Sequence, residues 1–309
     1  MSEVHFSKVA LIGLGLMASS LSLAMRRAGL AGSISGHAAT KATRDKALEL
    51  GLVDEVHDSA AAAVVGADLV VLCVPIGANA AIAEQIAPHL EPGAILTDVG
   101  SVKAAVVRDV APHVPEGVHF IPSHPIAGSE RSGPEAGFAE LFDGRWCIMT
   151  PLEGTDPEAL EKLHRFWQAC GSSIDIMTPS HHDLTLAITS HLPHIIAYNI
   201  VGTAADLEMV TRSEVIKYSA GGFRDFTRLA ASDPTMWRDI FLNNKEAVLE
   251  MLGRFSEDLT ALQRAIRWQD GETLFKMFSR TRKIRHSIID AGQDTDIPDF
   301  GRPHGAGDK

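Results

Sequence analysis

Cysteine is scarce in this chain of 309 residues, and the three cysteines, Cys73, Cys147 and Cys170, lie far apart. Such spacing argues against a disulfide framework and fits a reducing compartment. The N-terminus is polar and does not resemble a signal peptide. Together these features predict a cytoplasmic protein.

A surplus of basic residues is also missing, because the formal net charge is -11 and the isoelectric point is about 5.7. Proteins that bind nucleic acid normally carry excess positive charge, so we expect no nucleic-acid partner. Long apolar runs are missing too: residues 67–76 form one of the longest, which is shorter than a bilayer span. We therefore expect no membrane association.

The first part of the chain alternates short apolar runs with helix-like stretches. Continuous apolar runs are typical of strands that are buried on both faces of a parallel sheet. We expect strands at residues 8–15, 33–38, 68–75, 94–100, 119–124 and 146–151. The pattern predicts an α/β fold in which residues 1–178 form a Rossmann-type, doubly wound parallel sheet domain that binds a dinucleotide.

The second part, residues 179–309, shows no strand pattern and is expected to form an all-α helical dimerisation domain with a loose C-terminal tail. Helical patterns cover residues 180–207, 235–266 and 272–291. The middle pattern would form one helix roughly 45–50 Å long. Because one small domain does not cover such a helix, we expect it to pack against a second subunit in a homodimer. Packing within a single chain is the alternative.

A glycine-rich turn follows the first expected strand and opens the first expected helix. Residues 13–18 (GLGLMA) match the dinucleotide fingerprint G-x-G-x-x-G/A. Gly13 allows the tight turn, Gly15 lets the backbone approach a pyrophosphate, and Ala18 keeps the helix close to the strand. The alternative is a turn whose glycines serve packing alone.

The end of the second expected strand decides which dinucleotide binds. A carboxylate there normally contacts the adenosine ribose, but this sequence has none before Asp45. Thr40, Lys41 and Arg44 are available to a 2′-phosphate, which favours NADP over NAD; alternatively they are the solvated start of the next helix. The residues expected to bind the cofactor are Gly13, Gly15, Leu16, Met17, His37, Thr40, Lys41, Arg44, Cys73, Val74 and Pro75.

Further candidate residues lie where expected strands end, which is the ligand-binding edge of an open parallel sheet. Ser101 follows one such strand and either contacts a ligand or caps the next helix. His124 follows another strand, is followed by Pro125, and is suited to proton transfer near neutral pH.

These segments resemble one enzyme family. The fingerprint, DVGSVK (residues 98–103), SHPIAGSE (123–130), SHLPH (190–194) and GGFRDFTRLAASDPTMW (221–237) are similar to motifs of prephenate/arogenate (cyclohexadienyl) dehydrogenases of tyrosine biosynthesis. The resemblance covers about residues 9–289. It implies oxidative decarboxylation of prephenate or arogenate with hydride transfer to NAD(P), and it makes tyrosine a plausible product inhibitor.

The resemblance also implies roles for individual residues. His124 matches the catalytic histidine, and Ser101 matches a residue that orients this histidine or the substrate hydroxyl. Arg228 matches the arginine that holds a substrate carboxylate, for which its planar guanidinium is suited. His194 matches a position near the substrate side chain. His191 and Glu130 are further candidates for substrate binding. The alternative for His191 is a hydrogen-bonded residue between the domains, and the alternative for Glu130 is an exposed loop residue.

Three alternatives remain open on the sequence. Pro193 should kink the helix that carries His191 and His194. A metal site is an alternative for these two histidines together with the nearby run His181-His182-Asp183. The H-E-x-x-H spacing is absent, so we expect no metal. A different hydroxy-acid dehydrogenase would use Lys217 or Lys245 as its base. A non-catalytic NADP-binding sensor would need no base at all.

Overall fold

The computed structural model describes residues 5–129, 131–211 and 221–290. The chain divides into two compact units, Met1–Met251 and Leu252–Lys309, and the boundary falls inside one helix. The expected domain boundary at residue 178 lies within the first unit and stays a prediction.

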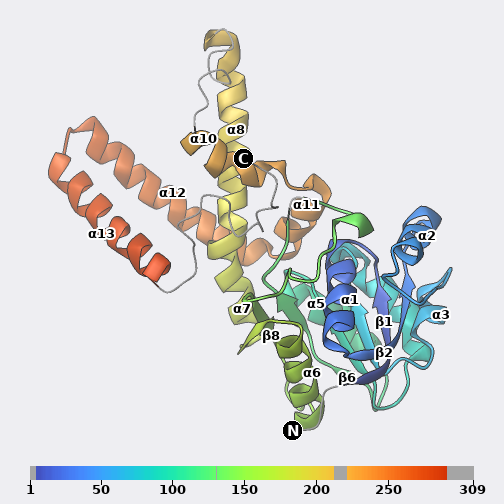
Figure 1. The fold of residues 1–309 in the computed structure, drawn as a ribbon. Coiled ribbons are helices and arrows are strands. Elements are labelled where there is room, and N and C mark those ends of the chain that lie inside the picture. Colours follow the sequence, from blue (N-terminus) through green and yellow to red (C-terminus); the bar gives the residue numbers. More distant parts are fainter. Residues whose placement is uncertain (1–4, 130, 212–220, 291–309) are drawn as a thin grey trace. The chain divides into compact units, whose positions relative to one another are not determined.

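The first unit is built on a parallel sheet whose strand order is β3-β2-β1-β4-β5-β6 (Figure 1). This order confirms the predicted Rossmann-type arrangement, in which the sheet is wound in both directions from β1. Its strands are β1 (Phe6–Ile12), β2 (Ala31–His37), β3 (Glu55–Val56), β4 (Leu69–Leu72), β5 (Ile95–Asp98) and β6 (His119–Phe120).

Helices cover both faces of this sheet. Alternate residues of β1 enter opposite cores: Val9 and Leu11 join one buried cluster, and Ala10 and Ile12 join the other. Burial on both faces is the reason that these strands are continuously apolar in sequence. The helices between the strands are α1 (Leu16–Ala28), α2 (Lys41–Glu49), α3 (Ala60–Val64), α4 (Asn79–Ile86) and α5 (Lys103–Val110).

A second, smaller sheet follows the first. It has the order β7-β8-β9, with β7 (Ser123–Pro125) antiparallel to β8 (Trp146–Met149) and β9 (Ser173–Ile176) parallel to β8; α6 (Pro157–Ala169) joins the last two. The single strand expected over residues 119–124 is therefore wrong. Pro122 has no N–H to donate to a strand ladder, and the chain leaves the first sheet there. The break places His124 on β7.

A long helical segment continues from the second sheet. It consists of α7 (Pro179–Leu186), a π-helical turn η5 (Ala187–His191) and α8 (Leu192–Thr211). Pro193 cannot donate an N–H to the preceding turn, and the wider π turn accommodates it. Farther along the chain, this unit contains α10 (Gly221–Thr227), η6 (Arg228–Ala231) and α11 (Pro234–Asn243).

The expected long helix over residues 235–266 is two helices. Asp233 caps α11, as the Ser-Asp-Pro sequence indicates, since its carboxylate accepts the Met236 N–H at 2.8 Å. The helix ends at Asn243, and Asn244 adopts a non-helical conformation before α12 (Lys245–Arg267) begins. Because neither helix has the expected length of roughly 45–50 Å, helix length does not indicate a second subunit.

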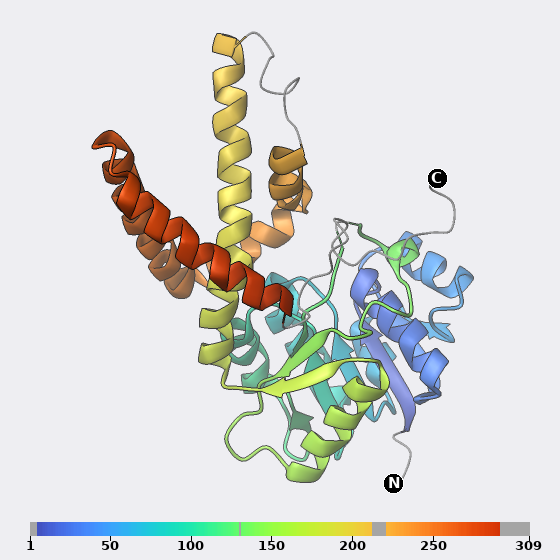
Figure 2. The same cartoon turned by 60° about the vertical axis from the view of Figure 1, so that its left-hand side comes forward.

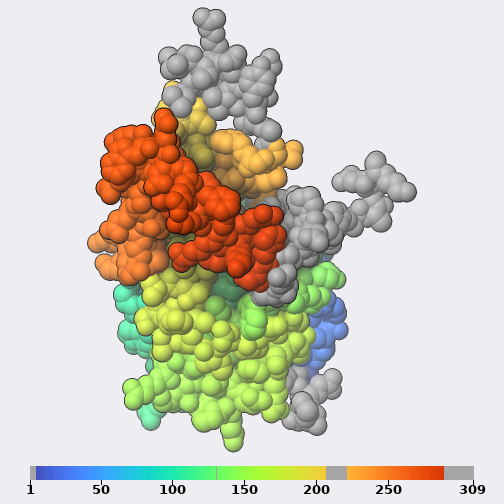
Figure 3. All heavy atoms as spheres, turned by 90° about the vertical axis from the view of Figure 1, so that its left-hand side faces the viewer, coloured from blue at the N-terminus to red at the C-terminus, as the bar shows by residue number. Residues whose placement is uncertain are grey.

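The second unit holds most of α12 and all of α13 (Gly271–Asp290), which run antiparallel to each other (Figure 1). Figure 2 shows α13 in front of α12, and Figure 3 shows the two helices in orange and red as adjacent parts of the surface. The apolar side chains of this unit include the highly exposed Trp268 (70%), in the turn between the two helices, and Phe275 (73%) on α13. Exposed large apolar groups of this kind are typical of surfaces that bind another protein.

One helical segment has about the expected length but is more apolar than the sequence analysis anticipated. Residues Pro179–Asp206 form 28 continuous helical residues with a mean hydropathy of 1.2 in the most apolar window, of which 28% is buried. By length and composition this helix meets the requirement for a membrane span, although core helices of soluble proteins meet it as well. The ionisable His182, Asp183 and His191 within it are buried against protein.

Candidate active site

The glycine-rich turn takes its shape from close contact with the neighbouring strand. Gly13 has φ +97°, and a Cβ at this position would lie 2.5 Å from the carbonyl oxygen of Cys73. Its N–H donates to the His37 carbonyl oxygen at 2.8 Å. Only glycine fits such a conformation and such a contact.

Gly15 leaves room for a ligand at the start of α1. A Cβ added there would meet nothing within 4 Å, and no side chain caps the helix. The first turn carries no acidic residue, and its N–H groups have no acceptor within the helix. This open, positively polarised end fits the pyrophosphate of a dinucleotide.

The residues considered for a 2′-phosphate all have partners in the structure. The Thr40 hydroxyl caps α2, Lys41 Nζ lies 2.6 Å from Asp45, and Arg44 donates to the Ala38 carbonyl oxygen and to Asp58. The His37 ring bonds the His57 carbonyl oxygen at 2.9 Å. These residues surround the end of β2, and the Lys41 and Asp58 side chains are exposed there.

The loop after β4 completes this part of the site. The Cys73 N–H donates to the Ile12 carbonyl oxygen at 2.7 Å, which holds Cys73, Val74 and Pro75 beside the glycine-rich turn. Burial, and then the charge of Asp98, raises the pKa of the Cys73 thiol. Cys73 therefore stays a neutral thiol, which lines the site and does not act as a nucleophile.

A buried ion pair lies behind the catalytic candidate. Lys103 Nζ donates to Asp98 Oδ2 at 2.5 Å and to the Ser123 carbonyl oxygen at 2.6 Å, and both charged side chains are inaccessible to solvent. Asp98 Oδ1 accepts the Ser123 N–H at 3.2 Å. The pair thus ties β5 and α5 to the residue immediately before His124.

His124 is bonded to a second histidine. Its Nδ1 lies 2.8 Å from His182 Nε2, and His182 Nδ1 lies 2.8 Å from Asp183 Oδ1. Asp183 in turn accepts the backbone N–H groups of Lys103 and Ala104 at 2.7 and 2.9 Å. The chain His124–His182–Asp183 therefore ends at the N-terminus of α5.

The environment keeps His124 uncharged. Burial lowers the pKa of His124 well below 6.5, and repulsion from His182 when it is protonated, from the charge of Lys103 and from His191 when it is protonated lowers it further. Burial also lowers the pKa of His182, although the hydrogen bond to Asp183 opposes this effect. A neutral imidazole at physiological pH is the form that acts as a general base.

His191 is positioned by a residue that the sequence analysis did not single out. The Asn244 amide, at the break between α11 and α12, donates to the Asp183 carbonyl oxygen at 2.9 Å and lies 3.1 Å from His191 Nδ1. The His191 side chain is buried, and burial lowers its pKa to about 4.

His194, Trp237 and Arg228 form the other part of the site. His194 stacks on the Trp237 ring at 3.5 Å and bonds the Ser190 carbonyl oxygen at 2.8 Å. Burial lowers the pKa of His194, the bond to Ser190 opposes this, and the charge of Arg228 adds to the lowering. The Trp237 ring also contacts His191 edge-on at 6.0 Å.

Three of the sequence-predicted residues, His124, His191 and His194, therefore lie in one connected set of contacts. His124 leads through His182 and Asp183 to Asn244 and His191, and the Trp237 ring then leads to His194. The charge of Arg228 acts on His194 and lowers its pKa. Sequence analysis missed His182 and Asp183 as partners of His124, and it missed Asn244 and Trp237. The His-His-Asp run at 181–183 was an available signal, but its side chains were considered for metal binding alone.

The remaining candidates are less closely tied to this set. Within the described residues, the Ser101 hydroxyl has no hydrogen-bond partner, so it neither caps α5 nor forms a hydrogen bond with His124 in the structure. Glu130 and Lys217 lie outside the described residues. The Lys245 side chain is 63% exposed and lies near Glu246, which does not suit it to act as a base in this site. In the described part of the chain, no three His, Cys, Asp or Glu side chains form a group suited to a metal ion.

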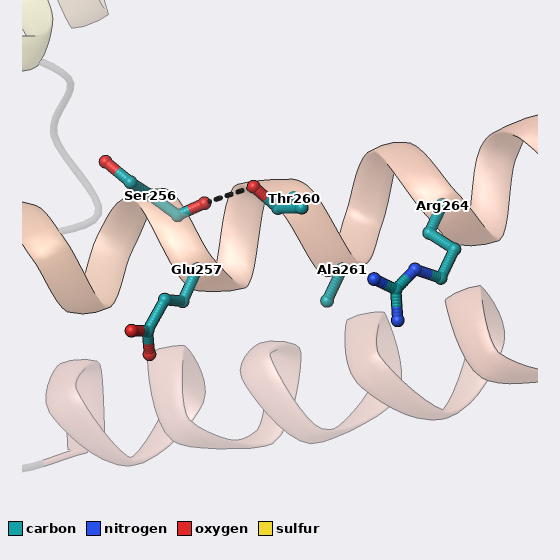
Figure 4. Close-up of a pocket in the computed structure, with 5 residues that line it drawn as sticks. All are labelled: Ser256, Glu257, Thr260, Ala261 and Arg264. Atoms are coloured by element: carbon teal, nitrogen blue, oxygen red, sulfur yellow. Dashed lines mark hydrogen bonds between the residues drawn. The ribbon is translucent and has the colours of Figure 1, made fainter.

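A surface hollow of about 380 Å³ lies elsewhere, on α12 (Figure 4). It contains none of the candidate residues. Its lining comes from one helix: Ser256, Glu257, Thr260, Ala261 and Arg264.

Comparisons with known protein families account for nearly the whole chain. The model of the prephenate dehydrogenase nucleotide-binding domain matches residues 21–176, and the model of the prephenate dehydrogenase dimerization domain matches residues 178–280. The chain belongs to the prephenate/arogenate dehydrogenase family. It is accordingly an NAD(P)-dependent oxidoreductase.

Individual relatives agree with this assignment. A cyclohexadienyl dehydrogenase of Zymomonas mobilis is 42% identical over 92% of this chain and 96% of its own. The structure of the A. aeolicus prephenate dehydrogenase in complex with hydroxyphenyl propionate and NAD+ has 34% identity and a TM-score of 0.87, covering 93% of this chain and 100% of its own. Synechocystis arogenate dehydrogenase has 31% identity and a TM-score of 0.77, covering 91% and 99%.

Proposed function

We propose that this dehydrogenase converts prephenate or arogenate to 4-hydroxyphenylpyruvate or tyrosine by oxidative decarboxylation, with NADP as the favoured cofactor. The observation that carries the proposal is the neutral, hydrogen-bonded His124 in the same network as the helical residues that would hold the substrate. The A. aeolicus relative, in complex with a hydroxyphenyl acid and NAD+, supports a ring acid as substrate.

His124 is the proposed general base. Its Nε2 takes the proton of the ring hydroxyl while the C–H bond at the same carbon gives its hydride to the nicotinamide, which serves as the two-electron acceptor. The bond from the ring to its carboxylate then breaks and releases carbon dioxide. Its electron pair makes the ring aromatic, and His124 returns the proton to the phenolic oxygen. General-base assistance of this kind is typically worth about 10²–10⁴-fold.

The helical residues are proposed to hold the substrate's charged and polar groups. Arg228 would bind a carboxylate through its planar guanidinium. His194, fixed flat against Trp237, and the buried His191 would face the side chain. Ser101, whose hydroxyl has no partner among the described residues, is free to bond the ring hydroxyl. Glu130 remains a candidate at the entrance.

The preference for NADP is proposed from the end of β2. His37 and Ala38 stand where a ribose-binding carboxylate is expected, and the Lys41 side chain, at the start of the following helix, is 78% exposed. The Lys41 contact with Asp45 is an exposed ion pair, which costs little to replace with a phosphate contact.

The dimerization-domain match and the exposed apolar side chains support a homodimer. Ile188, Ile200 and Val201 on the 179–206 helix are between 37% and 47% exposed, and a second copy would cover them. Light scattering of the purified protein should give twice the mass of 33.2 kDa. We also propose a cytoplasmic location, and inhibition by tyrosine at the active site because tyrosine keeps most of the substrate's shape.

The test is an initial-rate comparison of prephenate and arogenate, each with NADP and with NAD. We expect turnover of at least one substrate and a higher kcat/KM with NADP. His124→Ala should lower kcat by about 10²–10⁴-fold while leaving dinucleotide affinity unchanged.

His89→Ala is the matched control, because His89 is exposed and outside the network. No turnover of either substrate by the folded, dinucleotide-bound wild-type protein would reject the proposed reaction. Full turnover by His124→Ala would reject the base, and a preference for NAD would reject the cofactor assignment alone.

A further inference from the structure

The three groups His124, His182 and Asp183 form a directional hydrogen-bond chain. The direction starts at Asp183, whose Oδ1 accepts the Lys103 N–H and whose Oδ2 accepts the Ala104 N–H. Backbone N–H groups are donors without exception, so both carboxylate oxygens are acceptors. The first turn of α5 also favours negative charge at this place.

The charge on Asp183 determines which nitrogen of His182 carries hydrogen. His182 Nδ1 lies 2.8 Å from Asp183 Oδ1 and must donate to it. In the neutral ring, Nε2 is then an acceptor. That nitrogen lies 2.8 Å from His124 Nδ1, which must therefore donate.

The same reasoning determines whether His124 Nε2, the atom that takes the proton, carries a hydrogen. Neutral His124 with hydrogen on Nδ1 has its lone pair on Nε2, which is the form that accepts a proton from a ligand. The opposite direction would place a lone pair of His182 Nδ1 against a carboxylate oxygen in a site where the His182 side chain is fully buried. Two acceptors facing each other without water are strongly unfavourable.

The surrounding charges do not reverse this direction. The ammonium of Lys103 is already bonded to Asp98 Oδ2 and to the Ser123 carbonyl oxygen. His191 is hydrogen-bonded to Asn244 and not to His124 or His182. Asp183 is therefore the negative charge that is connected to His124 through hydrogen bonds.

We propose that His182 and Asp183 are positioning residues that fix His124 in its Nδ1–H form and stabilise the imidazolium that arises when Nε2 takes the substrate's proton. The proton moves from the ring hydroxyl to Nε2, and the Nδ1–H stays on His124 as a donor to His182. The catalytic part rests on the proposed function, whereas the hydrogen placement is a property of the protein without substrate.

The first experiment measures hydrogen placement directly. Protein labelled with ¹⁵N-histidine is examined by NMR at pH 7.5, and the His124 signals are identified by their loss in His124→Asn. We expect a protonated Nδ1 and an unprotonated Nε2. A neutral His124 with hydrogen on Nε2 in the wild-type protein would overturn the proposal.

The second experiment uses a graded pair of variants at His182. His182→Leu removes the acceptor, so we expect the Nε2–H form of His124 to appear and kcat to fall about 10²–10⁴-fold, with KM for the dinucleotide unchanged. His182→Gln keeps an amide oxygen as acceptor and should retain the Nδ1–H form and kcat within about tenfold. His181→Leu, at the adjacent exposed histidine, is the matched control and should change neither readout.

The outcomes separate this inference from the proposed function. The expected wild-type hydrogen placement with no turnover of prephenate or arogenate would reject the proposed reaction and leave the positioning role intact. Wild-type kcat and an unchanged Nδ1–H form in His182→Leu would reject the positioning role and leave the proposed reaction intact. The wild-type spectrum decides the hydrogen placement even where His182→Leu does not fold.

Discussion

Lys103 is a single buried residue that holds the backbone next to His124 in place. Lys103 is fully buried, and burial lowers its pKa while Asp98 opposes that effect. Its ammonium contacts both Asp98 and the Ser123 backbone, and Ser123 precedes His124. A buried pair contributes little net stability by itself, but removing one partner leaves an uncompensated charge.

Lys103→Met should therefore lower the free energy of unfolding by about 3–5 kcal/mol, because Asp98 stays buried without its partner. Lys276→Met is the matched control: Lys276 forms an exposed pair with Glu272 and should cost at most about 1 kcal/mol. Urea unfolding measures both. The double variant Lys103→Met/Asp98→Asn should regain part of the loss of stability caused by Lys103→Met. Equal losses of stability in Lys103→Met and Lys276→Met would contradict the argument.

At the scale of elements, the turn between β1 and α1 assigns different tasks to its two glycines. Gly13 is constrained by the protein, since it has positive φ and touches the Cys73 carbonyl oxygen. Gly15 has an ordinary φ of −95° and open space where its side chain would be. The first therefore serves folding, and the second keeps space for a ligand.

Gly13→Ala should destabilise the protein by at least about 2 kcal/mol, because it combines an unfavourable φ with a backbone clash. Gly15→Ala should leave the melting temperature unchanged and raise the Kd for the dinucleotide roughly tenfold, since its methyl group occupies the approach of the pyrophosphate. Thermal unfolding and calorimetric titration distinguish the two effects. A stable Gly13→Ala protein, or unchanged binding in Gly15→Ala, would contradict this division of roles.

The elements also show what could be predicted from the sequence. The β1–turn–α1 unit was predictable because its signals, an apolar run and a fingerprint, are local. The end of α11 was not: its apolar spacing continues through Asn244, whose hydrogen-bond partners His191 and Asp183 lie 53 and 61 residues away. His124 was predictable as a candidate from its motif. Its partner His182 was not, because only the fold brings these residues, 58 positions apart, together.

For the molecule as a whole, burial of several histidines couples stability to pH. Burial lowers the pKa values of His124, His182 and His191, the last to about 4 from an ordinary value near 6.5. Between these two values the unfolded chain binds the proton and the folded chain does not. The free energy of unfolding therefore rises with pH through this window. The stability that these neutral histidines contribute is lost as the pH falls from 6.5 toward 4.

His191→Gln removes one of these groups and should weaken the pH dependence. A difference between pKa values of 6.5 and about 4 corresponds to about 2–3 kcal/mol of stability lost between pH 7 and pH 4.5 in the wild-type protein. Urea unfolding of each protein at both pH values gives the free energy of unfolding that is lost between pH 7 and pH 4.5. We expect this loss to be smaller by about 2–3 kcal/mol in His191→Gln than in the wild-type protein, independent of the stability of the variant at pH 7. His89→Gln, at an exposed histidine, should keep the wild-type difference. An identical pH dependence in His191→Gln and the wild-type protein would show that His191 accepts its proton in the folded state as readily as in the unfolded chain, contrary to its burial.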